Sequence, residues 1–245
     1  MTPLEQHQKE IQKNLLVWQR KPVLQKAYAN IYERVLKLID PTQKQPVVEI
    51  GSGMGNLKSH LPEAICTDLF PNPWLDLVCD GYELPFADHS LSHLILSDVF
   101  HHLRAPRAFL LEAKRVLNKS GRLILSEPYI GAASYPIYGL FHHEPVARRA
   151  SIDFAETIER PRAYYAAQGN ATRLFFSDEF PNWLDGWNVF HRESYAAFAY
   201  FSSGGYSKPQ LCPTPFYGVL EGIDAKLSRW PRSFGGRCLV GLSVG

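Results

Sequence analysis

Residues 47–56, VVEIGSGMGN, decide the fold of this chain. The apolar half, residues 47–50, is short and rich in β-branched side chains, as in a buried strand. The second half contains Gly51, Gly53 and Gly55, which let the backbone turn sharply and approach a ligand closely. We expect a helix to follow, with its free N–H groups facing the same ligand. A glycine cluster by itself also fits a simple tight turn, so the flanking sequence has to decide.

Apolar runs typical of short strands alternate with a helical run after this stretch. Further strands are expected at residues 64–68, 75–79, 94–97 and 122–126, and a helix at 106–117. The first 40 residues show helical spacing that is interrupted at Pro22. Near the end of the chain we expect a strand at 193–201, a helix at 217–227 and a strand at 237–244. Alternation of this kind predicts an α/β domain with a parallel sheet covered on both faces.

Polar residues follow the second, third and fourth expected strands, at Asp68, Asp80 and Ser97. In a doubly wound sheet the carboxyl ends of the strands form the edge that holds the ligand. Each of these residues also fits ordinary turn chemistry, so the interpretation depends on their joint spacing. A dinucleotide fingerprint would read G-x-G-x-x-G/A, whereas this chain has G-x-G-x-G followed by Asn56. An NAD(P)-dependent oxidoreductase is therefore the disfavoured alternative.

Several motifs in a fixed order resemble the class I S-adenosylmethionine-dependent methyltransferases, and most closely their type 11 small-molecule group. They are EIGSGMG at 49–55, Asp68, DGYELPFADHSL at 80–91, SDVFHHL at 97–103, EAKRVL at 112–117 and GRLIL at 121–125. The resemblance covers about residues 45–130. It implies S-adenosyl-L-methionine as cofactor, with S-adenosyl-L-homocysteine as product. It also implies a Rossmann-like fold with a seven-stranded, mostly parallel sheet, N-terminal helices and an insertion after strand five.

The resemblance divides the single domain, residues 1–245, into four parts. They are an N-terminal helical cap at 1–40, a cofactor-binding core at 45–128, an acceptor lid at 129–185, and C-terminal strands with a helix at 186–245. The lid is expected because residues 129–175 are aromatic and irregular, with no predicted strand, and long irregular stretches in compact domains often bind ligands.

The same resemblance assigns cofactor binding to a row of positions at the carboxyl ends of the strands. They are Glu49, Gly51, Ser52, Gly53, Gly55, Asp68, Leu69, Asp80, Gly81 and Ser97. Asp68 would accept hydrogen bonds from both ribose hydroxyls, and Asp80 from the adenine amine. Leu69 would lie against one adenine face, and Glu49 would orient the amino-acid end. Carboxylates only accept hydrogen bonds, so they suit a diol and an amine, and they do not repel a sulfonium cation.

Catalysis is expected to need a base only where the acceptor must lose a proton, as a hydroxyl does. His142 or His143 could serve as that base, with Glu144 fixing its tautomer; a polar loop is the alternative explanation of these three residues. For His101 and His102 we expect a role in packing or in the cofactor pocket. No metal site is expected, because adjacent histidines should point in different directions. Oxygen is slightly preferred over nitrogen as the methyl acceptor.

Composition limits the remaining classes of protein. The chain has 26 Lys and Arg against 24 Asp and Glu, too even a balance for a protein that binds nucleic-acid phosphates. No apolar run approaches the ~20 residues that a membrane span needs. The four cysteines are scattered and the N-terminus is polar, so we expect a cytoplasmic protein with a small-molecule acceptor. A non-catalytic subunit that binds S-adenosylmethionine remains an alternative, and the oligomeric state cannot be read from the sequence.

Overall fold

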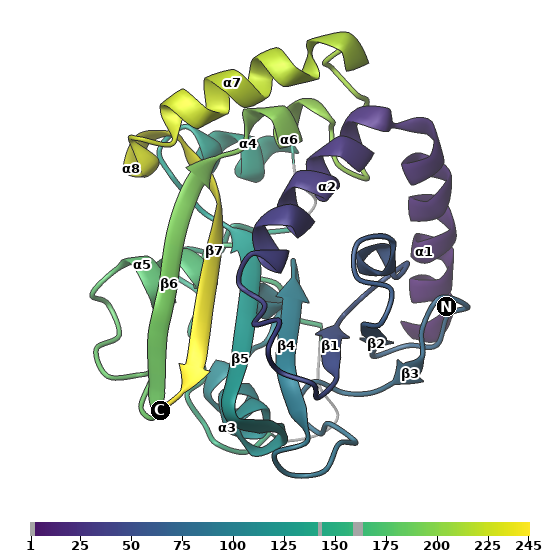
Figure 1. Cartoon of the computed structure of the whole chain (residues 1–245). Coiled ribbons are helices and arrows are strands. Elements are labelled where there is room, and N and C mark those ends of the chain that lie inside the picture. The colour runs from purple at the N-terminus through teal and green to yellow at the C-terminus, as the bar shows by residue number, and fades with distance from the viewer. Residues whose placement is uncertain (1–2, 142–143, 159–163) are drawn as a thin grey trace.

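The computed structural model describes residues 3–141, 144–158 and 164–245. Its centre is a seven-stranded sheet in the order β3-β2-β1-β4-β5-β7-β6 (Figure 1). The strands are β1 Val47–Ile50, β2 Ile65–Asp68, β3 Leu77–Val78, β4 Leu91–Ser97, β5 Leu117–Pro128, β6 Trp187–Ala196 and β7 Gly235–Val244. Strands β1 to β5 pair in parallel, and β7 runs antiparallel to both of its neighbours. The expected seven-stranded, mostly parallel α/β sheet is confirmed.

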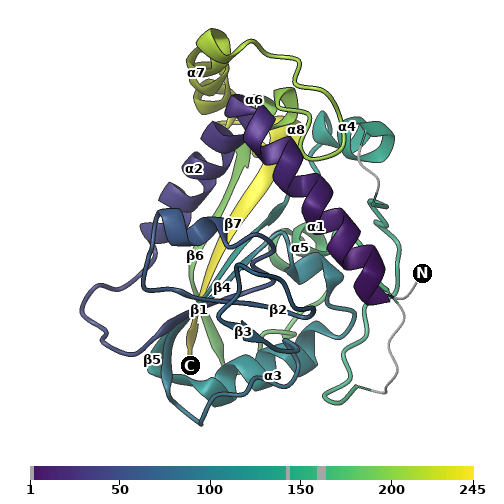
Figure 2. The ribbon, with the colours of Figure 1, turned by 90° about the vertical axis from the view of Figure 1, so that its right-hand side faces the viewer.

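Helices cover both faces of this sheet and one of its ends. They are α1 Pro3–Arg20, α2 Pro22–Leu36, α3 Pro106–Val116, α4 Ser134–Phe141, α5 Asn170–Phe176, α6 Phe198–Ser202, α7 Tyr217–Leu227 and α8 Pro231–Phe234. Three short 3₁₀ turns are η1 Asn56–Ser59, η2 Phe100–His102 and η3 Thr214–Phe216. Seen from the side, α2 lies on one face of the sheet, and α3 and α5 lie on the other (Figure 2). Within the described ranges, no helix has the length and apolar character needed to cross a membrane.

The core has two layers because successive strand residues point to opposite faces of the sheet. In β4, Leu94 and Leu96 belong to a large apolar cluster that includes residues of α3 and α5. The residue between them, Ile95, belongs to a second cluster that includes Tyr32 and Val35 of α2. Both layers are shielded from solvent, as a parallel sheet requires.

The prediction of a helix after the glycine turn is wrong. Only the single turn η1, Asn56–Ser59, forms there before the chain enters β2. The reason lies in Pro62, because the residue before a proline is disfavoured in helical conformation and a proline cannot continue the hydrogen-bond ladder. One turn is all that fits between Gly55 and that proline.

The strand expected at residues 193–201 is also wrong in its second half. Strand β6 ends at Ala196, and α6 begins at Phe198. The carboxylate of Asp224 accepts the backbone N–H groups of Phe198 at 2.9 Å and of Ala199 at 2.8 Å. These bonds satisfy donors that a helix start leaves open, and so they favour a helix where the local sequence looks strand-like.

The two-layered core makes a test of stability possible at β4. Leu94→Ala removes a side chain with no exposed surface, and we expect the free energy of unfolding to fall by about 2–5 kcal/mol. The matched control is Leu111→Ala on α3, where the side chain is 44% exposed and the expected loss is within about 0.5 kcal/mol. Chemical denaturation measures both. Equal losses would contradict the placement of β4 at the centre of the core.

Candidate cofactor and acceptor site

Strands β1, β2, β4 and β5 end at one edge of the sheet and bring the predicted residues together there. Ile50 pairs with Leu96, so Gly51 and Ser97 follow at the same level of neighbouring strands. Asp68 is the last residue of β2 and pairs with Val78 of β3, which places Asp80 two residues further along that edge. The sheet register therefore brings the residues predicted to bind the cofactor together at one edge.

The glycine turn after β1 has a backbone that other residues rarely adopt. Gly51, Gly53 and Gly55 have φ angles of +70°, +53° and +67°, all in the left-handed region. A Cβ atom at Gly51 would collide with the side chain of Val99, so this position also needs glycine for space. At Gly53 a Cβ atom would meet nothing within 4 Å. The turn thus leaves an open cradle above Gly53, and it fits the close approach of a cofactor.

Asp68 connects this turn to the end of β2. Its Oδ2 accepts the backbone N–H of Gly53 at 2.9 Å, and its Oδ1 accepts that of Leu69 at 2.7 Å. A carboxylate has about four lone-pair positions, so both oxygens keep the capacity to accept a further bond. The Leu69 side chain beside it is 51% exposed. The Asp68 carboxylate can accept hydrogen bonds from a ribose diol, and the exposed Leu69 side chain beside it can pack against an adenine face.

Asp80 and Gly81 form a turn after β3. Asp80 Oδ1 accepts the backbone N–H of Tyr82 at 3.1 Å. Gly81 lies over Ile50 and Phe109, and a Cβ atom there would make only ordinary contacts. A residue with a side chain would therefore fit at position 81, whereas none fits at position 51. At the end of β4, Ser97 Oγ is buried with no hydrogen-bond partner among the described residues.

Glu49 is a buried carboxyl beneath the glycine turn, with 2% of its surface exposed. The thiol of Cys66 donates to Oε2 of Glu49 at 3.8 Å. Burial raises the pKa of the Glu49 carboxyl to about 8. Ser52 Oγ and Thr67 Oγ1 donate to its backbone carbonyl, which ties β1 to the turn and to β2. Perturbed carboxyl groups of this kind concentrate at functional sites.

The second half of the edge is organised around Glu127 near the end of β5. Its Oε1 accepts the backbone N–H groups of Val99 at 2.8 Å and of Phe100 at 2.7 Å. Its Oε2 lies 2.6 Å from Nδ1 of His101. A buried carboxylate with three donors is well satisfied, and it holds η2 against the end of β5. Nothing in the local sequence links Glu127 to His101, 26 residues earlier in the chain.

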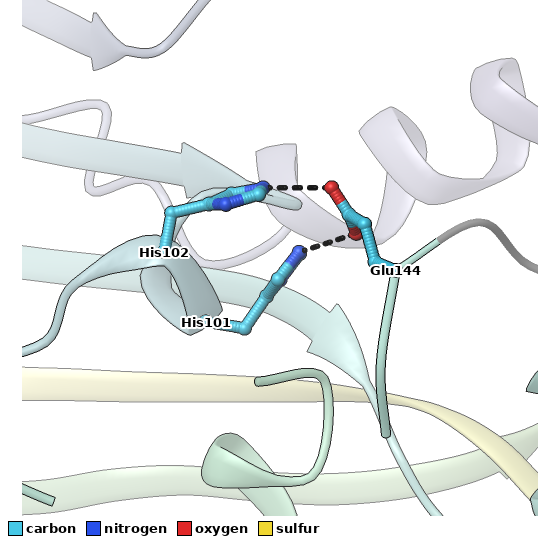
Figure 3. A group of neighbouring side chains, drawn as sticks. All are labelled: His101, His102 and Glu144. Carbon is cyan, nitrogen blue, oxygen red and sulfur yellow. Dashed lines mark hydrogen bonds and ion pairs between the residues drawn. The ribbon is translucent and has the colours of Figure 1, made fainter. Parts of the chain in front are cut away.

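Glu144 faces both histidines of η2 (Figure 3). Its Oε2 is 3.2 Å from His101 Nε2, and its Oε1 is 3.3 Å from His102 Nε2. Tyr164 Oη also donates to Oε1 at 3.0 Å, and Gln168 Nε2 to Oε2 at 3.2 Å. The carboxylate that the sequence paired with His142 or His143 is therefore bound to His101 and His102. His142 and His143 themselves lie outside the described residues.

The charges of this cluster reinforce one another. Burial opposes protonation of His101, but the Glu127 and Glu144 carboxylates on either side raise its pKa to about 10. Burial also opposes ionisation of Glu144, yet the hydrogen bonds from His101 and His102 hold its pKa well below its usual range. His101 is therefore more than a packing residue, because it bridges two carboxylates inside the protein.

Sequence analysis missed an ion pair between a buried arginine and a partly exposed aspartate. Arg237 of β7 is 1% exposed, and its Nη1 is 2.9 Å from Oδ1 of Asp98. Its guanidinium also lies over the Tyr200 ring, 5.2 Å from the centroid. Asp98 directly follows β4 and has a left-handed φ of 59°. The signal was present in the sequence, since a lone arginine in the apolar run 235–244 needs an acidic partner.

The pKa of Glu49 predicts how stability depends on pH. The folded state keeps the carboxyl proton up to about pH 8, whereas the unfolded chain loses it near pH 4.5. Stability from this group therefore falls as pH rises from about 5 to 8. Glu49→Gln has no carboxyl group to ionise. Its free energy of unfolding relative to that of the wild type should therefore grow over that pH range by a few kcal/mol, about 1.4 kcal/mol per pKa unit.

Denaturation at several pH values measures this difference, and Glu63→Gln, at an exposed position, is the control. The Glu63→Gln difference should not change with pH. A constant difference for Glu49→Gln as well would mean that Glu49 is ionised in the folded protein.

Comparison with known proteins gives the same assignment as the fold. The model of a methyltransferase domain family, type 11, matches residues 48–125. No curated protein sequence is significantly similar to the chain. Geranyl diphosphate C-methyltransferase from Streptomyces coelicolor, solved with S-adenosyl-L-homocysteine, has a TM-score of 0.54 at 11% identity, covering 89% of this chain and 81% of that one.

Two further solved structures share the architecture. A Haloferax volcanii chain from a complex with the Trm112 methyltransferase activator has a TM-score of 0.53 at 17% identity, covering 99% of this chain and 97% of that one. A methyltransferase from Thermotoga maritima has a TM-score of 0.52 at 14% identity, with coverages of 91% and 92%. Residues 48–125 therefore match a methyltransferase domain of type 11, and the chain has the Rossmann-like fold of the class I S-adenosylmethionine-dependent methyltransferases.

Proposed function

We propose that this protein transfers the methyl group of S-adenosylmethionine to a small cytoplasmic metabolite, with oxygen favoured over nitrogen as acceptor. The observation that carries the proposal is the Asp68 carboxylate bonded to Gly53 beside an open, left-handed glycine turn. The sulfonium methyl is already activated for displacement, so the protein contributes chiefly by placing the two reactants in line and excluding water.

The cofactor would bind along the ends of β1, β2 and β4. Asp68 accepts the two ribose hydroxyls in this proposal, and Asp80 with the N–H of Gly81 holds the adenine ring beside Leu69. The turn from Gly51 to Gly55, with Ser52, passes beneath the ribose and the methionine part. Glu49 orients the amino-acid end, and the main chain at Ser97 lines it.

The acceptor would bind beneath residues 129–185, which we propose as the lid. This segment passes close to the histidines of η2, because the N–H of Ala167 donates to the carbonyl of His101 at 3.0 Å. Its later part, with Leu174 and Phe175 of α5, is packed into the main core and would anchor the lid. One of His142 and His143 serves as base in this proposal, and Glu144 lies next to them in the chain. A hydroxyl needs such a base, which is why oxygen is favoured.

Calorimetry separates the proposal from its alternatives. Binding of S-adenosylmethionine without binding of NADPH supports it, and the reverse result would favour an oxidoreductase. Release of S-adenosylhomocysteine is then followed over a panel of small hydroxyl and amine compounds. Tight cofactor binding without release for any of them would favour a non-catalytic subunit.

Replacement of Asp68 tests the cofactor half of the site. Asp68→Ala removes the acceptor of two ribose hydroxyls, and each hydrogen bond to a charged group contributes about 1.5–3 kcal/mol. We expect the dissociation constant of S-adenosylmethionine to rise at least ~10-fold in calorimetry, since 1.4 kcal/mol corresponds to that factor. The control is Asp88→Ala, an exposed turn carboxylate that should leave affinity unchanged. An unchanged dissociation constant for Asp68→Ala would contradict the proposal that Asp68 binds the ribose hydroxyls.

Replacement of His142 and His143 tests the acceptor half. Loss of a general base typically lowers the rate by about 10²–10⁴-fold while cofactor binding is kept. One residue of the pair is the base in this proposal, so His142→Ala and His143→Ala should differ sharply in turnover. The rate of the active protein should rise with pH through a pKa near 6–7, because the base must be neutral. The control is His191→Ala on β6, and normal turnover in both variants would refute base catalysis by this pair.

A further inference from the structure

We propose that His101, His102 and Glu144 form a binding site for one divalent transition-metal ion of the Zn²⁺ type. Two imidazole nitrogens and one carboxylate are a ligand set that such ions favour. The sequence argued against a metal, because adjacent histidines were expected to point apart. The tight turn η2 instead places their ring centroids 4.2 Å apart, and both Nε2 atoms face Glu144 (Figure 3).

The distances between the ligand atoms suit a shared ion. One atom from each of the three residues lies within 4.8 Å of the others. His101 Nε2 and His102 Nε2 are 3.2 and 3.3 Å from the carboxylate oxygens of Glu144. With metal–ligand bonds of about 2.0–2.1 Å, neighbouring ligand atoms of a tetrahedral site are about 3.3 Å apart. Charge-assisted hydrogen bonds are usually shorter, about 2.7–2.9 Å. The separations of 3.2 and 3.3 Å are therefore closer to the spacing of metal ligands than to that of such hydrogen bonds.

Each histidine is also held by its other nitrogen in the way that metal-binding histidines require. His101 Nδ1 lies 2.6 Å from the carboxylate of Glu127, and His102 Nδ1 lies 3.0 Å from the backbone carbonyl of Tyr165. Neither oxygen can donate a proton, so both rings carry N–H at Nδ1. A neutral imidazole with Nδ1–H presents a lone pair at Nε2, and a carboxylate or carbonyl partner at Nδ1 is the usual arrangement around bound metal ions.

The charge of the cluster also suits a cation. The carboxylates of Glu127 and Glu144 lie on either side of His101, at 2.6 and 3.2 Å from its ring nitrogens. A divalent ion bound between the Nε2 atoms and Glu144 would be balanced by these two carboxylates, and any proton that it displaces would leave to solvent.

The place of the site in the fold suggests what the ion would bind. Three protein ligands leave an open coordination position, as in sites that bind water or substrate. The His101 side chain is 3% exposed and that of Glu144 11%, whereas that of His102 is 30% exposed, so access is from the His102 side. If the proposed function holds, an acceptor oxygen could take this position and lose its proton more readily.

Cobalt binding tests the site without any methyl transfer. Untagged protein is stripped with chelator and titrated with Co²⁺, followed by visible absorption, and Zn²⁺ is then added in competition. We expect one equivalent to bind, and His102→Gln and Glu144→Gln to weaken binding by about 100-fold or more, since even loss of a ligand's supporting group costs 10–100-fold. The matched control is His191→Gln, whose side chain has a similar exposure of 32% and should bind as wild type does.

Circular dichroism shows whether each variant folds. If only one of the two variants folds, its cobalt affinity alone decides the test. No cobalt absorption by folded wild-type protein would overturn the proposal and leave a purely ionic cluster. Equal binding by wild type and both variants would place the ion elsewhere and overturn it too. Asp68→Ala should keep its cobalt binding, so the metal site and the proposed function can fail independently.

Discussion

The buried carboxylate of Glu127 is the constraint on which the rest of the site depends. It has no exposed surface, and it accepts the N–H groups of Val99 and Phe100 and faces Nδ1 of His101. A carboxylate taken out of water is costly unless its oxygens find donors, so the chain after β4 must turn to supply them. That turn is η2, and it aims both histidines toward Glu144.

The buried Arg237 and its partner Asp98 hold the other end of the same segment. Arg237 on β7 reaches Asp98, the residue that leaves β4 with a left-handed backbone. The reversed strand of the sheet thus supplies the cation that holds the start of the segment, while Glu127 on β5 holds its end. Residues 98–101 are clamped between two neighbouring strands, and removing Asp98 would leave the buried charge of Arg237 uncompensated.

The two halves of the edge are built in different ways. The proposed cofactor half is local: the glycine turn, Asp68 and the end of β2 lie close together in the chain and are joined by hydrogen bonds. The proposed acceptor half joins segments that are far apart in the chain. His101 meets Glu127 across 26 residues and Glu144 across 43. A turn with fixed geometry can receive an invariant cofactor, and a surface assembled from separate segments can vary with the acceptor.

The sequence by itself determined the α/β class, the mostly parallel sheet and the positions of the glycine turn and Asp68. These features follow from hydrophobic periodicity and from residues with restricted backbone choices, which act over short distances. Only the tertiary structure decided that α6 replaces the end of a strand, and that Glu144 turns to His101 and His102. Each of these outcomes depends on a partner brought near by the fold, such as Asp224 for α6. Local patterns carry no information about such partners, because side-chain hydrogen bonds and ion pairs form only after the sheet has set the distance between them.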